Sequence, residues 1–237
     1  MTGGVLAVIP AKGFSRRVPN KNMRLFNGRP LIAYTIEQAL KSQLVDDVYV
    51  STDSPEIQAF AVSGGAQAPF LRPPELSRDD VHGSVPILHM LEQLGGAARY
   101  GYCVQLLPTS PLKTARTIDE VVRRSIASRA NVLSVTRTGK ILDHVRTLAS
   151  DGRLHTITKE AVYNFQTQDK PELLMINGAV YCAPADELLA HRTFQYGQPV
   201  GYPMDPLEAV DIDTEADFLI AERLAGLLLT EEASHDA

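Results

Sequence analysis

A short loop near the start of this 237-residue chain carries the residues best suited to binding a polyanion. Residues 5–9 are apolar and mostly β-branched, which predicts a strand, and residues 30–41 have the pattern of a helix. Residues 10–22, directly after the predicted strand, contain four cations, one glycine and one serine: Lys12, Arg16, Arg17, Lys21, Gly13 and Ser15. A loop that joins a strand to a helix presents backbone amides to phosphates at the carboxyl end of a parallel sheet, and lysine or arginine neutralises their charge.

The spacing in this loop is neither that of a Walker A motif nor GxGxxG. A solvated basic turn is the alternative interpretation. The position directly after the first predicted strand favours phosphate binding.

Two carboxylates close to the carboxyl end of the chain could hold a divalent cation. Asp211 and Asp213 flank Ile212, so in an extended segment both point to one side while Ile212 faces the core. Mg²⁺ is bound by one or two carboxylates together with substrate phosphates. In the alternative interpretation, Asp213 caps the helix that starts near Thr214 and Asp211 is solvated. Together with a phosphate loop, the pair is typical of a nucleotidyl-transfer site.

A proline-rich turn follows another predicted strand. Pro108 and Pro111 restrict the backbone and leave the hydroxyls of Thr109 and Ser110 at the strand end. A rigid connection between strand and helix and a wall of a substrate site are both open. Asn177 begins a later strand and is compatible with a simple turn.

The composition limits the class of protein. A hydrophobic fraction of 44% supports a substantial core, and a net charge of -5 argues against general nucleic-acid binding. The two cysteines have no zinc spacing and indicate buried thiols in a reducing compartment. We see neither a signal peptide nor a membrane span, so we expect a soluble, cytoplasmic protein.

Strands and helices alternate along the predicted chain. We expect an α/β fold, a three-layer Rossmann-like sandwich around a mostly parallel sheet, in one domain over residues 1–230. Residues 137–176 interrupt the alternation and are predicted to form an inserted arm, and residues 231–237 a flexible tail. The predicted strands are Val5–Ile9, Asp47–Ser51, Tyr100–Leu107, Asn131–Thr136 and Ala179–Cys182. The predicted helices are Pro30–Lys41, Pro55–Ser63, Val85–Leu94, Ala115–Ser128 and Thr214–Leu229.

Several segments together resemble the CMP-sialic acid synthetases (acylneuraminate cytidylyltransferases) and relatives that activate other acid sugars. They are IPAKGFSRRVPNKN at 9–22, GRPLIAYTIEQAL at 28–40, VYVSTDSPEI at 48–57, LRPPELSRDD at 71–80, LLPTSPLKT at 106–114, NGAVYCA at 177–183 and DIDTEADF at 211–218. The resemblance covers almost the whole chain in the family's order. It implies a Rossmann-like nucleotidyltransferase fold, a homodimer formed through the inserted arm, Mg²⁺ dependence, and transfer of CMP from CTP to an acidic acceptor with release of pyrophosphate.

The resemblance also assigns residues. Lys21, Arg16 and Asp211 become the catalytic candidates, and Asp211 and Asp213 the metal ligands. Arg72 matches a position that reads cytosine, whose adjacent O2 and N3 acceptors suit a guanidinium fork. The nucleotide site comprises Ala11, Lys12, Gly13, Ser15, Arg16, Lys21, Asn22 and Arg72. The acceptor candidates are Gln105, Thr109, Ser110, Arg146, Lys170 and Asn177.

Several residues depart from the family pattern, and the nucleotide half matches that pattern better than the acceptor half. Lys12 and Lys113 replace arginines, Phe14 replaces a small residue, and Leu107 stands where many sialic acid enzymes have glutamine. We therefore expect a nonulosonic or related 2-keto-3-deoxy acid sugar as acceptor. A non-sugar anion such as a phosphonate or phosphonoformate, and a catalytically silent nucleotide-binding homologue, are the alternatives.

Overall fold

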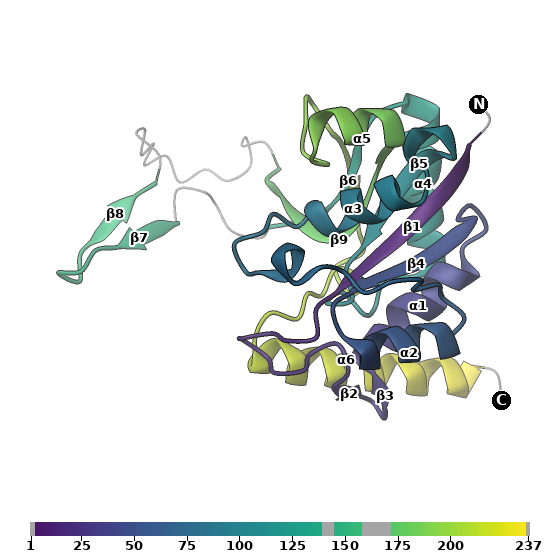
Figure 1. Cartoon of the computed structure of the whole chain (residues 1–237). Helices are drawn as coiled ribbons and strands as arrows, with labels where there is room; N and C mark the ends of the chain where they lie inside the picture. Colours follow the sequence, from purple (N-terminus) through teal and green to yellow (C-terminus); the bar gives the residue numbers. More distant parts are fainter. Residues whose placement is uncertain (1–2, 139–144, 158–171, 236–237) are drawn as a thin grey trace.

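A six-stranded sheet forms the centre of the protein in a computed structural model that describes residues 3–138, 145–157 and 172–235 (Figure 1). The strand order is β10-β6-β9-β5-β1-β4. The bounds are β1 Gly4–Ala11, β4 Asp47–Thr52, β5 Tyr100–Leu106, β6 Val132–Arg137, β9 Leu174–Pro184 and β10 Val200–Pro203. The sheet is mostly parallel, since only β9 runs antiparallel to both of its neighbours, β5 and β6.

Helices cover both faces of this sheet, which confirms the three-layer architecture (Figure 1). α1 (Leu31–Lys41), α2 (Pro55–Ser63) and α4 (Ala115–Ser128) contribute to one buried apolar cluster. α3 (Val85–Gln93) and α5 (Ala185–His191) contribute to a cluster on the other face. The central strands are buried on both sides, which explains why residues 5–9 are apolar throughout instead of alternating.

Two elements, α5 and β10, were not predicted from the sequence. α5 has only seven residues, fewer than a helix periodicity requires to be recognised. β10 has four residues, Val-Gly-Tyr-Pro, and glycine and proline both argue against a strand. Proline is tolerated there because β10 is an edge strand.

A third, smaller cluster joins the basic loop to the last helix, α6 (Glu215–His235). This cluster buries Val18 of the loop, Ile212 of the segment before α6, and Phe218 of α6 almost completely. Ile212 therefore faces the core, as expected. α6 continues six residues past its expected end at Leu229, and helix takes up most of the tail expected at 231–237. That extension contains no glycine or proline that would end a helix.

The expected arm leaves the sheet after β6 and returns in β9. Its described part includes a hairpin of β7 (Arg146–Leu148) and β8 (Leu154–Thr156), which stands apart from the main body (Figure 1). Residues 174–176 rejoin the sheet by pairing with residues 135–137, so the excursion ends slightly before the expected boundary at 176.

Two further strands, β2 (Leu25–Phe26) and β3 (Arg29–Pro30), form a short hairpin, and 3-10 turns occupy η1 (Pro74–Ser77) and η2 (Gly96–Ala98). Among the described residues, no helix is long and apolar enough to span a membrane.

Candidate active site

The basic loop is fixed at both ends by buried contacts. Val18 anchors its middle in the third cluster, and the side-chain amide of Asn22 donates to the carbonyl of Lys12 (2.8 Å). Gly13 donates its backbone N–H to Asp53 Oδ1 (2.8 Å). A Cβ at Gly13 would lie 2.9 Å from Ser54 Cβ, so only glycine allows the loop to approach the start of α2 this closely.

Each of the four loop cations faces an acidic side chain. Lys12 Nζ lies 3.1 Å from Asp79 Oδ1, and Arg16 Nε lies 2.6 Å from Asp79 Oδ2. Arg17 pairs with Asp213 at 3.0 Å, and Lys21 Nζ lies 3.9 Å from the same carboxylate. The loop encloses a hollow of about 420 Å³ that is lined by Lys12, Phe14, Ser15, Arg16, Arg17, Val18, Lys21 and Asp79. The hollow is therefore strongly cationic, with Asp79 as its acidic lining residue.

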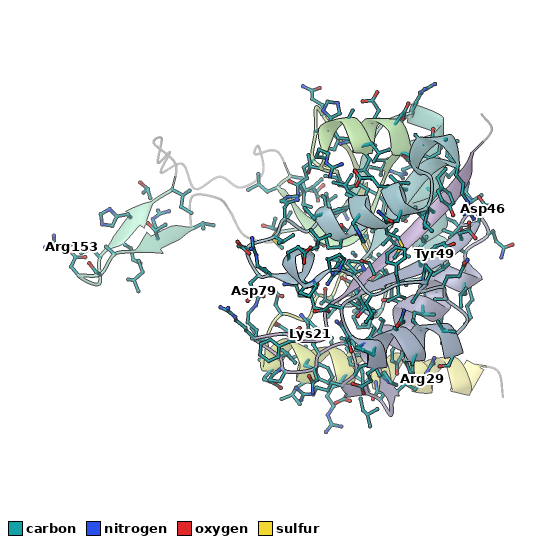
Figure 2. All side chains as sticks on the ribbon, in the orientation of Figure 1. Lys21, Arg29, Asp46, Tyr49, Asp79 and Arg153 are labelled. Carbon is teal, nitrogen blue, oxygen red and sulfur yellow. The ribbon has the colours of Figure 1, made fainter. Side chains whose placement is uncertain are left out.

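Lys21 connects the loop to the carboxylate pair. Its ammonium donates to the carbonyl of Ile212 (2.6 Å), between Asp211 and Asp213. Burial lowers the pKa of Lys21, while the charges of Asp213 and Asp211 act in the opposite direction. Figure 2 shows Lys21 and Asp79 on the side of the body from which the hairpin projects.

Arg72 is fixed in a buried position beside the end of β4. Its backbone N–H donates to the carbonyl of Thr52 (2.6 Å), its Nε to Ser77 Oγ (2.8 Å) and one terminal nitrogen to the carbonyl of Ser51 (3.2 Å). The other terminal nitrogen is buried, lies 3.9 Å from Asp53 Oδ1 and has no hydrogen-bond partner within the described residues. Burial lowers the pKa of Arg72, and Asp53 opposes this shift.

Asp53 therefore lies between Arg72 and the basic loop, a position that could not be predicted from the sequence. The residue lies in the VYVSTDSPEI segment, where its neighbours dominate the helix-start pattern. In the structure, Ser54 rather than Asp53 caps α2, by accepting from the N–H of Ile57. Asp53 is left to orient the loop through Gly13.

The surroundings of Asp211 suit a metal ligand, and Asp213 does not have the structural role of capping α6. The carboxylate of Asp211 accepts from the Thr109 hydroxyl, and its Oδ1 is buried without a hydrogen-bond partner in the described part of the chain. Burial raises the pKa of Asp211, and the charge of Asp213 adds to the rise. Thr214 and Asp217 exchange the capping hydrogen bonds of α6, so the alternative in which Asp213 caps this helix is wrong.

The carboxylates of Asp211 and Asp213 suit Mg²⁺, and Oδ1 of Asp211 is buried without a hydrogen-bond partner among the described residues. Mg²⁺ is a hard cation that binds one or two carboxylates and completes its coordination shell with phosphates and water. Within the described residues, no group of three or more histidine, cysteine, aspartate or glutamate side chains could hold a metal ion. A metal at this position would therefore depend on substrate oxygens for the rest of its ligands.

The proline-rich turn touches this pair directly. The N–H of Ile212 donates to the carbonyl of Thr109 (2.8 Å), so Thr109 contacts the carboxylate segment through both backbone and side chain. Ser110 is fully buried, and its hydroxyl has no hydrogen-bond partner among the described residues. Lys113, which sequence analysis noted only as a departure, is buried beneath the same turn.

The remaining acceptor candidates are dispersed. Gln105 is buried on β5 opposite Tyr181 of β9. The amide of Asn177 is engaged by Ser134 (2.5 Å) and Thr136 (2.8 Å), where the pairing of β6 and β9 shifts register. Arg146 is the first residue of β7, in the hairpin that stands apart from the main body in Figure 1. Lys170 lies outside the described residues.

A family model described as cytidylyltransferase matches residues 6–225, which is nearly the whole chain. The chain belongs to the cytidylyltransferase family.

Among the relatives of this cytidylyltransferase, a CMP-N,N'-diacetyllegionaminic acid synthase of Legionella pneumophila is 33% identical over 94% of the chain and 97% of its own length. An N-acylneuraminate cytidylyltransferase of Escherichia coli is 32% identical over 92% of the chain but only 51% of its own length. A pseudaminic acid cytidylyltransferase of Campylobacter jejuni is 36% identical over 54% of the chain and 56% of its own length.

Solved structures show the same fold at low identity. A CMP:2-keto-3-deoxy-manno-octonic acid synthetase complexed with CTP aligns with a TM-score of 0.71 and 15% identity, over 95% of this cytidylyltransferase and 99% of that chain. A 4-diphosphocytidyl-2C-methyl-D-erythritol synthase from Anaerococcus prevotii aligns with a TM-score of 0.66 and 10% identity, over 94% and 99%. These matches confirm the expected Rossmann-like nucleotidyltransferase fold.

Proposed function

We propose that this cytidylyltransferase transfers CMP from CTP to an acid sugar of the nonulosonic class and releases pyrophosphate. The observation that carries the proposal is the bond from Lys21 to Ile212, which joins the cationic hollow to Asp211 and its unpartnered carboxylate oxygen. Phosphate-binding cations and a metal-type carboxylate then lie on either side of one ammonium group. The relatives named for legionaminic, pseudaminic and N-acylneuraminic acids support the acceptor class.

In the proposed reaction, a hydroxyl of the acceptor attacks the α-phosphorus of CTP. A bond forms between that oxygen and the α-phosphorus, the bond from the α-phosphorus to the bridging oxygen breaks, pyrophosphate leaves, and the hydroxyl proton passes to Asp211 or to a water molecule. Lys12, Arg16 and Lys21 would bind the triphosphate and offset the charge that develops on it. Arg72 would direct its unpartnered N–H at cytosine.

Asp211 and Asp213 would hold Mg²⁺, which would neutralise phosphate charge when bound. Asp211 would point its orphan oxygen toward the ion, while Thr109 holds the other side of the carboxylate. Thr109 thus acts in the proposal by orienting Asp211, in addition to its expected place near the acceptor.

A single chain brings together fewer of the candidate acceptor-binding residues than of the candidate nucleotide-binding residues. Arg146 lies on a hairpin that stands apart from the main body, and Asn177 already uses its amide within the sheet. We propose that the arm packs on a second copy of the chain, so that a homodimer brings cations such as Arg146 and Lys170 to an acceptor carboxylate. The reaction would take place in the cytoplasm, where CTP is available.

A direct assay tests this function. The full chain is incubated with CTP and Mg²⁺ and with legionaminic, pseudaminic, N-acetylneuraminic and 2-keto-3-deoxy-octonic acids or phosphonoformate, and pyrophosphate and product mass are followed. We expect a CMP conjugate with at least one nonulosonic acid and none with phosphonoformate. Binding of CTP without release for any acceptor would instead identify a silent homologue.

Two lysine substitutions test the role of Lys21 in this assay: Lys21→Ala is the test variant and Lys41→Ala is its matched control. Lys21→Ala should reduce turnover by about 3 kcal/mol of transition-state stabilisation, the size typical of a lost contact to developing charge. Lys41→Ala removes an exposed lysine of α1 that pairs with Glu37, and should leave turnover unchanged. Equal activity of Lys21→Ala and the wild type would contradict the assigned role.

A further inference from the structure

Lys113 is a buried lysine outside the residues assigned above. Its side chain is almost completely inaccessible, yet its ammonium donates to three acceptors: Leu107 O (2.6 Å), Ser110 O (2.7 Å) and Thr35 Oγ1 (2.8 Å). An ammonium has three N–H groups and no acceptor, so the geometry uses all of its hydrogen bonds. A single side chain thereby fixes the proline-rich turn at two carbonyls and ties it to α1.

This turn is also the support of Asp211. Thr109 lies inside the segment that Lys113 fixes, between the two bonded carbonyls of Leu107 and Ser110. Thr109 in turn accepts from the N–H of Ile212 and donates its hydroxyl to Asp211. Lys113 is therefore connected to the carboxylate through hydrogen bonds to Leu107 and Ser110, the intervening backbone of the turn, and the hydrogen bond from Thr109 to Asp211.

Charge gives a second link between the two groups. Burial lowers the pKa of Lys113 to about 7, and the charge of Asp211 is the effect that opposes this shift. The two groups therefore interact electrostatically although they are not bonded to each other. Burying an ammonium group costs desolvation free energy. Packing alone does not explain Lys113, since an apolar side chain would fill the same space without that cost.

We propose that Lys113 is a positioning residue that holds the 107–114 turn so that Thr109 aims Asp211 at the metal of the nucleotidyl-transfer site. The proposal rests on the cytidylyltransferase function proposed above. Hydrogen-bond partners behind a ligand typically set metal affinity or activity by ten- to a hundredfold, about the range expected here. Lys113 does not touch substrate in this scheme, and it acts through Thr109.

The test compares Lys113→Met, Lys113→Arg and Thr35→Val in the full chain, with Lys41→Met as an exposed control. CTP affinity is measured by calorimetry with EDTA and again with Mg²⁺, and Mg²⁺ half-saturation of turnover is measured separately. We expect Lys113→Met to reduce the gain in CTP affinity on adding Mg²⁺, and to raise the half-saturating Mg²⁺, by about tenfold. CTP affinity in EDTA should stay within about twofold, since Arg72 and the loop cations are untouched.

The two other variants separate positioning from folding. Lys113→Arg keeps donors in the turn and should recover most of the Mg²⁺ response, while Thr35→Val removes only one of three bonds and should raise the Mg²⁺ requirement about two- to threefold. If Lys113→Met does not fold, these two variants still decide the question.

Equal losses of CTP affinity with and without Mg²⁺, or an unchanged Mg²⁺ response in folded variants, would overturn the positioning role. Failure of the proposed function is distinguishable, because the wild-type chain would then release no pyrophosphate at any Mg²⁺ concentration.

Discussion

Asp79 contacts two of the cations that the proposed function assigns to the triphosphate. It pairs with Lys12 and Arg16, and these contacts lower the pKa of its carboxyl, with the Lys12 hydrogen bond as the largest cause. A triphosphate needs the same cations, so the carboxylate competes with the substrate. Asp79→Asn should therefore tighten CTP binding about two- to fivefold, the range expected for exposed ion pairs. Calorimetric titration with CTP at low and high salt measures the change.

The neighbouring residue offers a matched control for that substitution. Asp80 is also exposed but pairs with Arg78 instead of the loop cations, so Asp80→Asn should leave CTP affinity unchanged. Weaker CTP binding in Asp79→Asn would show that Asp79 helps to order the loop rather than competing for its charges.

Asp211 has a cost for stability that can be measured through its pH dependence. Its folded-state pKa is raised by burial, so the ionised carboxylate is less favourable in the folded than in the unfolded chain. The penalty is absent below the ordinary aspartate pKa, because both states are then protonated, and is complete once the pH exceeds the folded-state pKa. In EDTA, Asp211→Asn should therefore raise the melting temperature by a few degrees at pH 7 and by nothing near pH 3. In a separate assay with Mg²⁺, the same substitution should abolish turnover.

Thermal unfolding from pH 3 to pH 8 tests this sign. Asp213→Asn is the comparison, since its half-exposed carboxylate lies beside Arg17 and Lys21 and should give no gain in stability. A lower melting temperature for Asp211→Asn at pH 7 would mean that the carboxylate stabilises the fold through Thr109.

The site could be predicted from sequence where residue type alone implies chemistry. Clustered cations after a predicted strand and a pair of carboxylates indicated phosphate and metal binding, and both assignments stay predictions. Asp53 and Asp79 could not be found this way, because their importance comes from facing the loop across 40 and 67 positions of sequence. Lys113 was equally hidden, since sequence does not show that an ammonium is buried among three acceptors.

At the scale of elements, one buried valine connects the loop to the rest of the site. Val18 packs with Ile212 and Phe218, so the third cluster fixes Lys21 opposite the carboxylates that flank Ile212. Val18→Ala should cost about 2 kcal/mol of unfolding free energy through lost burial and a small cavity. It should also raise the KM for CTP, which a loss of stability alone would not do in the folded population.

Denaturant unfolding and steady-state kinetics at a temperature where the variant is folded measure both effects. Val62→Ala is the control, since Val62 is exposed on α2 and its truncation should change neither quantity. An unchanged KM together with the expected loss of stability would separate the cluster from the nucleotide site.

Elements were predicted well where strands are buried on both faces and helices have clear starts. β1, β4 and α4 have such patterns, and their expected bounds differ from the observed ones by at most two residues. α5 was missed because seven residues are too few for a helix periodicity, and β10 was missed because its four residues include a glycine and a proline. The end of α6 failed because a polar sequence without a breaker does not distinguish a helix from a tail.

At the scale of the whole molecule, the hairpin of β7 and β8 projects from the body and has no hydrophobic core of its own. β7 and β8 have three residues each, and a two-stranded hairpin of this size is not stable by itself in water. Leu148 pairs directly with Leu154, yet their side chains are 72% and 69% exposed. Figure 2 places Arg153 at the hairpin tip, well away from the body. A second chain is the partner that the proposed homodimer supplies.

Removing this exposed apolar pair should therefore separate the two chains. Leu148→Ser with Leu154→Ser deletes two leucines that the dimer would bury, each worth about 2 kcal/mol, so the dissociation constant should rise by several orders of magnitude. Sedimentation velocity across a range of protein concentrations should show a monomer for this double variant and a dimer for the wild type. Val62→Ser removes a comparably exposed residue of α2 and should leave the dimer intact.

If the acceptor site needs the partner's arm, the monomer should keep its CTP affinity and lose transfer, since the loop, Arg72 and Asp211 all lie within one chain. A wild-type chain that sediments as a monomer, or a double variant that remains dimeric, would rule out dimerisation through the arm.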